Sequence, residues 1–219
     1  MENRVSIAAL IFDLDGTLVD SADDIAEAVN RTLEDLSLPR APEAVVRGWI
    51  GSGARQLLAD ALTHAGSARR LDEAMPNFMR HYRDCLLLSP RLYAGVREAL
   101  RQFHARGLPM AVCSNKPSAM IEPLLEHLRI GDFFSHLVGG DTLPQRKPAP
   151  EPLWHLARLF GQPPSRCLMV GDSATDLHAA NAAGMAVALV RYGYRQDLDL
   201  DAAGAWAVVD DLRELLARV

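Results

Sequence analysis

The chain has 219 residues, 49% of them hydrophobic, which is enough to bury the core of one sizeable domain or of one domain that carries an insertion. Its 23 basic and 28 acidic residues give a net charge of −5 without a basic run, which argues against nucleic acid as a partner. No stretch resembles a signal peptide or a membrane span, and the three widely spaced cysteines are typical of buried thiols in a cytoplasmic protein.

The first predicted element is a fully buried strand, because residues 7–12 are apolar and carry no charge. Apolar residues at helical spacing then predict helices over 22–36, 43–49, 55–65 and 72–88. No strand pattern occurs between Asp20 and Pro90. About seventy residues are therefore expected to be all helical.

From residue 90 onward, predicted strands alternate with predicted helices. The strands are expected at 108–113, 137–138, 167–170, 186–190 and 205–209, and the helices at 96–106, 120–128, 152–160, 174–183 and 212–219. This alternation predicts an α/β fold, a doubly wound parallel sheet with helices on both faces. Residues 1–16 and 92–219 are assigned to this core domain, and residues 17–91 to an inserted helical cap domain.

Polar side chains follow four of the predicted strands. They are Asp13 and Asp15; Ser114, Asn115 and Lys116; Lys147; and Asp172 and Asp176. Because the carboxyl ends of parallel strands open on one edge of the sheet, we expect these groups to converge on one crevice. Carboxylate oxygens suit Mg²⁺, whereas ammonium, hydroxyl and backbone N–H groups suit a phosphate.

Lysine is scarce in this chain. Only Lys116 and Lys147 occur among the 23 basic residues, and the others are arginine. Both follow predicted strands, which indicates that lysine is kept where a compact ammonium is wanted. The role of Lys116 is left open.

Four segments taken together resemble the motifs of the haloacid dehalogenase-like superfamily. They are Asp13-Leu14-Asp15-Gly16-Thr17, Ser114-Asn115, Lys147-Pro148 and Gly171-Asp172-Ser173-Ala174-Thr175-Asp176. The resemblance implies that Asp13 is a nucleophile that forms an aspartyl-phosphate. It implies that Asp15 protonates the leaving alcohol and then activates water. It further implies Mg²⁺ held by Asp13, the backbone carbonyl of Asp15 and Asp172.

The same resemblance assigns supporting roles around these groups. The phosphoryl oxygens are expected to be bound by Ser114, Asn115 and Lys147. Thr17 is expected to orient Asp15, and Asp176 to be a partner of metal-bound water or of Lys147. An aspartate at position 15 favours phosphoryl transfer over dehalogenation, and the absence of lysine from residues 17–91 argues against a phosphonate-cleaving relative.

Substrate choice is expected to depend on the predicted cap. Gly51, Ser52 and Gly53 can offer backbone N–H groups to an anion, and Arg55 can clamp a carboxylate; alternatively this segment is a simple helix–helix turn and Arg55 a solvated surface residue. With the first motif and Tyr192-Gly193-Tyr194, the cap segment resembles bacterial phosphoglycolate phosphatases, which implies 2-phosphoglycolate as the substrate. Another small phosphate monoester, such as a sugar or amino-sugar phosphate, stays open, as do a non-catalytic binding module and a monomer or homodimer.

Overall fold

The computed structural model describes residues 6–194 and 198–219; residues 1–5 and 195–197, assigned to the core by prediction, lie outside the described residues. A sheet of six parallel strands in the order β5-β4-β1-β6-β7-β8 forms the core. The strands are β1 (Ala9–Phe12), β4 (Met110–Cys113), β5 (His136–Val138), β6 (Cys167–Gly171), β7 (Ala186–Val190) and β8 (Ala207–Val209). The predicted parallel sheet is confirmed, with strand ends that differ by up to two residues.

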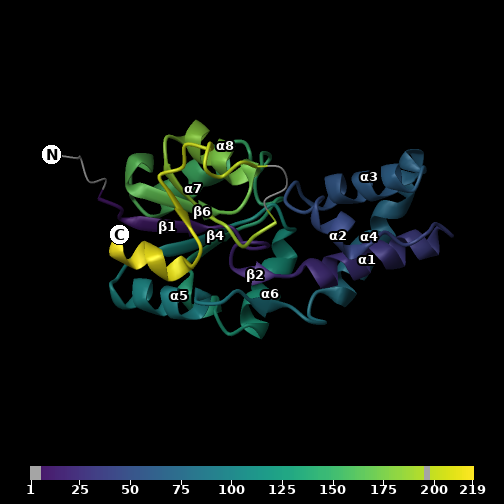
Figure 1. The fold of residues 1–219 in the computed structure, drawn as a ribbon, viewed down its shortest axis with the longest axis horizontal. Coiled ribbons are helices and arrows are strands. Elements are labelled where there is room, and N and C mark those ends of the chain that lie inside the picture. The colour runs from purple at the N-terminus through teal and green to yellow at the C-terminus, as the bar shows by residue number, and fades with distance from the viewer. Residues whose placement is uncertain (1–5, 195–197) are drawn as a thin grey trace.

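Helices cover both faces of this sheet (Figure 1). They are α5 (Val96–Ala105) and α6 (Ile121–His127) on one face, and α7 (Glu151–Leu159) and α8 (Ala174–Ala183) on the other. Along β1, Leu10 and Phe12 belong to one hydrophobic cluster, and Ala9 and Ile11 belong to the other. Burial on both faces explains why this strand has no polar alternation.

The helical insertion extends beyond one end of the sheet (Figure 1). Its helices are α1 (Ala22–Asp35), α2 (Glu43–Arg47), α3 (Ala54–His64) and α4 (Leu71–Cys85). Residues 21–90, all of them described, hold no strand, as predicted. Short 3₁₀ helices occur at Ala68–Arg70, Ser118–Met120, Gly131–Phe133, Pro164–Arg166 and Leu212–Ala217, the last in place of the predicted terminal α-helix. Among the described residues, no helix is both long and apolar enough to cross a membrane.

The two chain segments that join the insertion to the core pair with each other. β2 (Val19–Asp20) runs antiparallel to β3 (Arg91–Leu92), with Val19 opposite Leu92. The sequence analysis missed this pair because a strand of two residues has no periodicity to recognise. The domain boundaries after residues 16 and 91 stay a prediction.

Candidate active site

Two buried aspartates leave the end of β1 toward different partners. Oδ1 of Asp13 lies 2.9 Å from Nζ of Lys147, whereas the two carboxylate oxygens of Asp15 lie 3.1 and 3.2 Å from Nζ of Lys116. Side chains two apart on a regular strand point to the same side, so this divergence arises because the chain leaves the strand after Phe12. The chain then turns at Gly16, whose φ is +93° and whose missing Cβ would collide with the carboxylate of Asp172. Glycine is needed here on both counts.

A cluster of carboxylates lies beside Asp13. Oxygen atoms of Asp13, Asp172 and Asp176 lie within 4.8 Å of one another, and all three residues are buried. Burial is the largest cause that raises the pKa of Asp13 to about 7, against the opposing charge of Lys147. Burial, together with the charges of Asp13 and Asp176, also raises the pKa of Asp172 well above its ordinary value. Three oxygen-rich groups that repel one another around a single ammonium suit a hard divalent cation.

Asp176 differs from Asp172 in how its oxygens are used. Its Oδ1 accepts a bond from Lys147 Nζ at 2.6 Å, and its Oδ2 accepts bonds from the backbone N–H groups of Asp172 and Ser173 and from the Ser173 hydroxyl. These four bonds use the acceptor capacity of one carboxylate. Asp176 therefore positions Lys147 and caps α8, which is the Lys147 contact that the sequence analysis expects.

Of two hydroxyl groups near the first motif, Thr17 binds a different carboxylate from the one expected. Thr17, predicted to orient Asp15, instead donates from Oγ1 to Oδ1 of Asp172 at 3.1 Å. Ser21 is the hydroxyl that donates to Asp15, at 2.6 Å. Ser21 occupies the N-cap position of α1, but its side chain makes no capping bond there. An N-cap serine is common, so its sequence position carried no signal of this second role.

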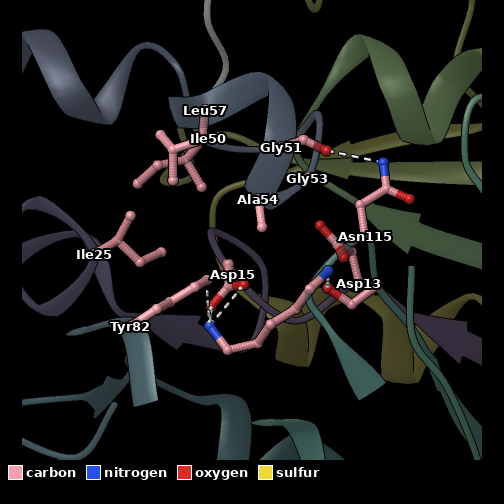
Figure 2. A pocket seen from close by; sticks show the side chains of 12 residues that line it. Asp13, Asp15, Ile25, Ile50, Gly51, Gly53, Ala54, Leu57, Tyr82 and Asn115 are labelled. Atoms are coloured by element: carbon pink, nitrogen blue, oxygen red, sulfur yellow. Dashed lines mark hydrogen bonds and ion pairs between the residues drawn. The ribbon is translucent and has the colours of Figure 1, made fainter. Parts of the chain in front are cut away.

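A small cavity lies between the strand ends and the helical insertion (Figure 2). The core side is lined by Asp13, Asp15, Ser114, Asn115 and Lys116. The insertion side is lined by Ile25, Ile50, Gly51, Gly53, Ala54, Leu57 and Tyr82. The cavity volume is about 30 Å³, which holds only about one or two water molecules. The helical insertion therefore lies closed over the strand ends.

The cavity gathers some of the predicted cap residues and leaves others outside. Gly51 and Gly53 line it, and the side-chain amide of Asn115 donates to the carbonyl of Gly51 at 3.0 Å. Ser52 and Arg55 are not among its lining residues. Arg55 instead binds Asp72 at 2.7 Å on the surface, with 55% of its side chain exposed. The structure thus does not bring the expected arginine clamp to the cavity, because the side chain extends toward the start of α4.

Sequence reasoning missed Tyr82, and it cited Tyr194 within the Tyr192-Gly193-Tyr194 motif without a role. Tyr82 reaches the cavity from α4, where its spacing is indistinguishable from that of a core residue. The backbone N–H of Tyr194 donates to Oδ2 of Asp172 at 2.6 Å, and its hydroxyl contacts both Asp20 and the backbone N–H of Ser21. Tyr194 thus ties the carboxylate cluster to the segment that enters the helical insertion.

Known proteins are similar to this chain over nearly its whole length. The model of the family described as haloacid dehalogenase-like hydrolase matches residues 10–190. The phosphoglycolate phosphatase of Pseudomonas putida is 42% identical over 212 residues, 94% of this chain and 78% of the relative. That of Colwellia psychrerythraea is 41% identical over 215 residues, 94% of each chain. The crystal structure of a predicted phosphoglycolate phosphatase from Haemophilus somnus 129pt has a TM-score of 0.92 at 36% identity and covers 97% of both chains.

A parallel sheet with buried carboxylates at its strand ends, closed by helices inserted after the first strand, defines an α/β enzyme with its reacting groups under a cap. The chain belongs to the haloacid dehalogenase-like hydrolase family. The family and the phosphoglycolate phosphatase-like branch predicted from the sequence are thereby confirmed.

Proposed function

We propose that the chain is a Mg²⁺-dependent phosphatase that hydrolyses 2-phosphoglycolate to glycolate and phosphate through an aspartyl-phosphate intermediate. The observation that carries this proposal is the divergence of the two aspartates. Asp13 lies in the carboxylate cluster beside Lys147, whereas Asp15 lies against Ser21 and Lys116 on the other side of the chain. The 42% identical relative named phosphoglycolate phosphatase supports the choice of substrate.

In the first step, a carboxylate oxygen of Asp13 attacks phosphorus and the ester P–O bond breaks. Asp15 gives its proton to the leaving oxygen, which departs as the alcohol of glycolate. In the second step, Asp15 takes a proton from water as that water attacks phosphorus. The bond between phosphorus and Asp13 then breaks, which restores the carboxylate and releases phosphate.

The surrounding residues supply charge and orientation. Lys147 faces Asp13 and can bind a phosphoryl oxygen, and Ser114 lines the cavity together with Asp13. Asp13, Asp172 and the backbone carbonyl of Asp15 would hold Mg²⁺, which when bound neutralises the repulsion between a carboxylate nucleophile and a phosphate dianion. The raised pKa values of Asp13 and Asp172 fit this role, because buried carboxylates that repel one another favour a cation between them.

The experiment that tests the proposal is the measurement of kcat/KM for 2-phosphoglycolate beside sugar phosphates, amino-sugar phosphates and nucleoside monophosphates, with Mg²⁺ and with EDTA. We expect turnover only with Mg²⁺ and a clear preference for 2-phosphoglycolate. A preference for another ester would keep the chemistry and reject the substrate. Rapid acid quenching followed by mass spectrometry should find one phosphoryl group on the peptide that contains Asp13.

A further inference from the structure

One buried cation remains without a role in these steps. The ammonium of Lys116 is fully buried and contacts Asp15 and the Tyr82 hydroxyl, the latter at 2.8 Å. Lys147, the other lysine, is committed to Asp13 and Asp176. Among the described residues that line the cavity, Lys116 carries the one side-chain positive charge. A buried ammonium is costly unless its partners are well placed, so its presence in the cavity requires an explanation.

The wall of the cavity opposite the strand ends is mostly apolar. Figure 2 shows Ile25, Ile50 and Leu57 grouped on the insertion side, with Ala54 between this group and the aspartates. The closed cavity is too small for a phosphate ester, so the insertion has to move outward on binding; a sugar beside this wall would then place several hydroxyl groups against side chains that cannot bond them. A short carbon chain would pack there without that cost. The lining thus favours an ester whose non-phosphate part is small and carries few hydroxyl groups.

Lys116 and Tyr82 together present donors beside this apolar wall. The three N–H donors of the ammonium meet the Tyr82 hydroxyl and both oxygens of Asp15, and a bound oxygen would take the place of the longest of these contacts, the one of 3.2 Å with Asp15. The Tyr82 oxygen accepts the bond from Lys116, so its own O–H can donate to a bound oxygen. Burial raises the pKa of Tyr82 to about 12, against the opposing charge of Lys116, so the phenol keeps its proton. Two adjacent donors, one of them charged, match the two oxygens of a carboxylate.

We propose that Lys116 and Tyr82 form the subsite that binds the carboxylate of the substrate. This subsite selects a short phosphorylated carboxylic acid over phosphate esters of the same length that have no carboxylate. This inference rests on the proposed function and gives its substrate preference a structural cause. It also moves the carboxylate contact from Arg55, on the surface, to a lysine at the strand ends.

The test compares two probes that differ only in the carboxylate. 3-Phosphonopropionate replaces the bridging oxygen of 2-phosphoglycolate by carbon, and propylphosphonate further replaces the carboxylate by a methyl group; neither can be hydrolysed. Isothermal titration in the presence of Mg²⁺ gives a Kd for each. We expect the wild-type protein to bind 3-phosphonopropionate about 100-fold more tightly, the value for a charged group that loses its hydrogen-bonding partner.

Three variants show which residues cause the difference in Kd between the two probes. In Lys116→Met, the ratio of the two Kd values should be about threefold or less. In Tyr82→Phe, which keeps the ring and leaves Lys116 in place, the ratio should be about five times smaller than in the wild-type protein. Arg55→Met is the control: it removes a cation of the helical insertion that lies outside the cavity. It should leave the ratio of the two Kd values unchanged. If Lys116→Met does not fold, as judged by circular dichroism, Tyr82→Phe and Arg55→Met still decide the question.

The remaining outcomes overturn the inference. If Lys116→Met weakens both probes equally and keeps their ratio, the lysine only positions Asp15. If Arg55→Met abolishes the ratio, the carboxylate lies on the surface arginine. If the wild-type protein hydrolyses 2-phosphoglycolate but binds the two probes equally, the subsite is wrong and the proposed function stands. A wild-type protein that does not hydrolyse 2-phosphoglycolate contradicts the proposed function itself.

Discussion

At the scale of single residues, chemically identical groups differ because their partners differ. Asp13 and Asp15 are two positions apart, yet only Asp13 belongs to the carboxylate cluster, whereas Asp15 is held by a hydroxyl and an ammonium. Repulsion within a cluster suits a group that, under the proposed function, a metal would neutralise. Hydrogen bonds donated by a hydroxyl and an ammonium hold the other carboxylate in one direction, as a proton-transfer group requires. Two roles follow from one motif.

Asp13→Asn tests the nucleophile. The amide has nearly the shape of the carboxylate but is a poor nucleophile, so kcat should fall about 10⁴-fold or more. The free energy of unfolding in EDTA should be no lower than in the wild-type protein, because one of three mutually repelling buried carboxylates is gone. Phosphate release and thermal unfolding measure the two quantities. Near-normal turnover in a folded variant would contradict covalent catalysis by Asp13.

Thr17→Val and Ser21→Ala separate the two hydroxyl groups. Thr17 binds Asp172, so its loss should raise the Mg²⁺ concentration for half-maximal activity about tenfold. Ser21 binds Asp15, so its loss should lower kcat about tenfold and leave the Mg²⁺ requirement unchanged. Magnesium titrations of activity on both variants give the comparison. The reverse pattern would restore Thr17 as the residue that orients Asp15.

At the scale of elements, local patterns were predictable and contacts between distant segments were not. The six-residue apolar run before Asp13 and the helical spacing after it depend on neighbouring residues, and both elements form. The pairing of β2 with β3 joins residues about seventy positions apart, and no local pattern encodes it. The convergence of Asp13, Lys147 and Asp172 was predictable because it follows from strand topology. The direction of the Arg55 side chain was not, because it depends on how α3 packs beside Asp72.

Gly53→Ala tests the contact between residues 51–53 of the helical insertion and the strand ends. Gly53 has a φ of +90°, and a Cβ there would lie 3.2 Å from the carbonyl oxygen of Asn115. Alanine at this backbone conformation should cost about 1–3 kcal/mol. Because the strain falls on the closed arrangement, kcat/KM should fall about fivefold to 100-fold.

Gly48→Ala is the matched control in the same segment. Gly48 is helical, with φ −68° and ψ −13°, and the nearest contact of an added Cβ is the Val45 carbonyl at 3.4 Å. Its kcat/KM should stay within about twofold of the wild-type value, since alanine favours this conformation. Equal losses of kcat/KM in the two glycine variants would mean that the approach of Gly53 to Asn115 does not affect activity.

At the scale of the whole molecule, the cluster of Asp13, Asp172 and Asp176 lowers the stability of the metal-free protein above acidic pH. The pKa of Asp13 is raised from 3.8 to about 7, and that of Asp172 is raised well above 3.8, chiefly by burial. An acid with a raised pKa in the folded state binds its proton more tightly there than in the unfolded chain. Its contribution to the free energy of unfolding therefore falls as pH rises from about 4 to about 7. Carboxylates with lowered pKa values, such as Glu27 beside Arg31 and Arg40, act in the opposite direction.

The difference in the free energy of unfolding between the wild-type protein and Asp172→Asn separates the effect of the carboxylate cluster from that of the surface carboxylates, which are the same in both proteins. In EDTA, the free energy of unfolding of the wild-type protein relative to this variant should fall as pH rises from 4 to 7. Mg²⁺ at about 100 times its Kd should restore about 2.7 kcal/mol to the wild-type protein at pH 7. It should restore less at pH 5, where protons compete for the carboxylates. Urea unfolding at each pH measures these values, and an equal response to Mg²⁺ in Asp172→Asn would mean that the metal binds elsewhere.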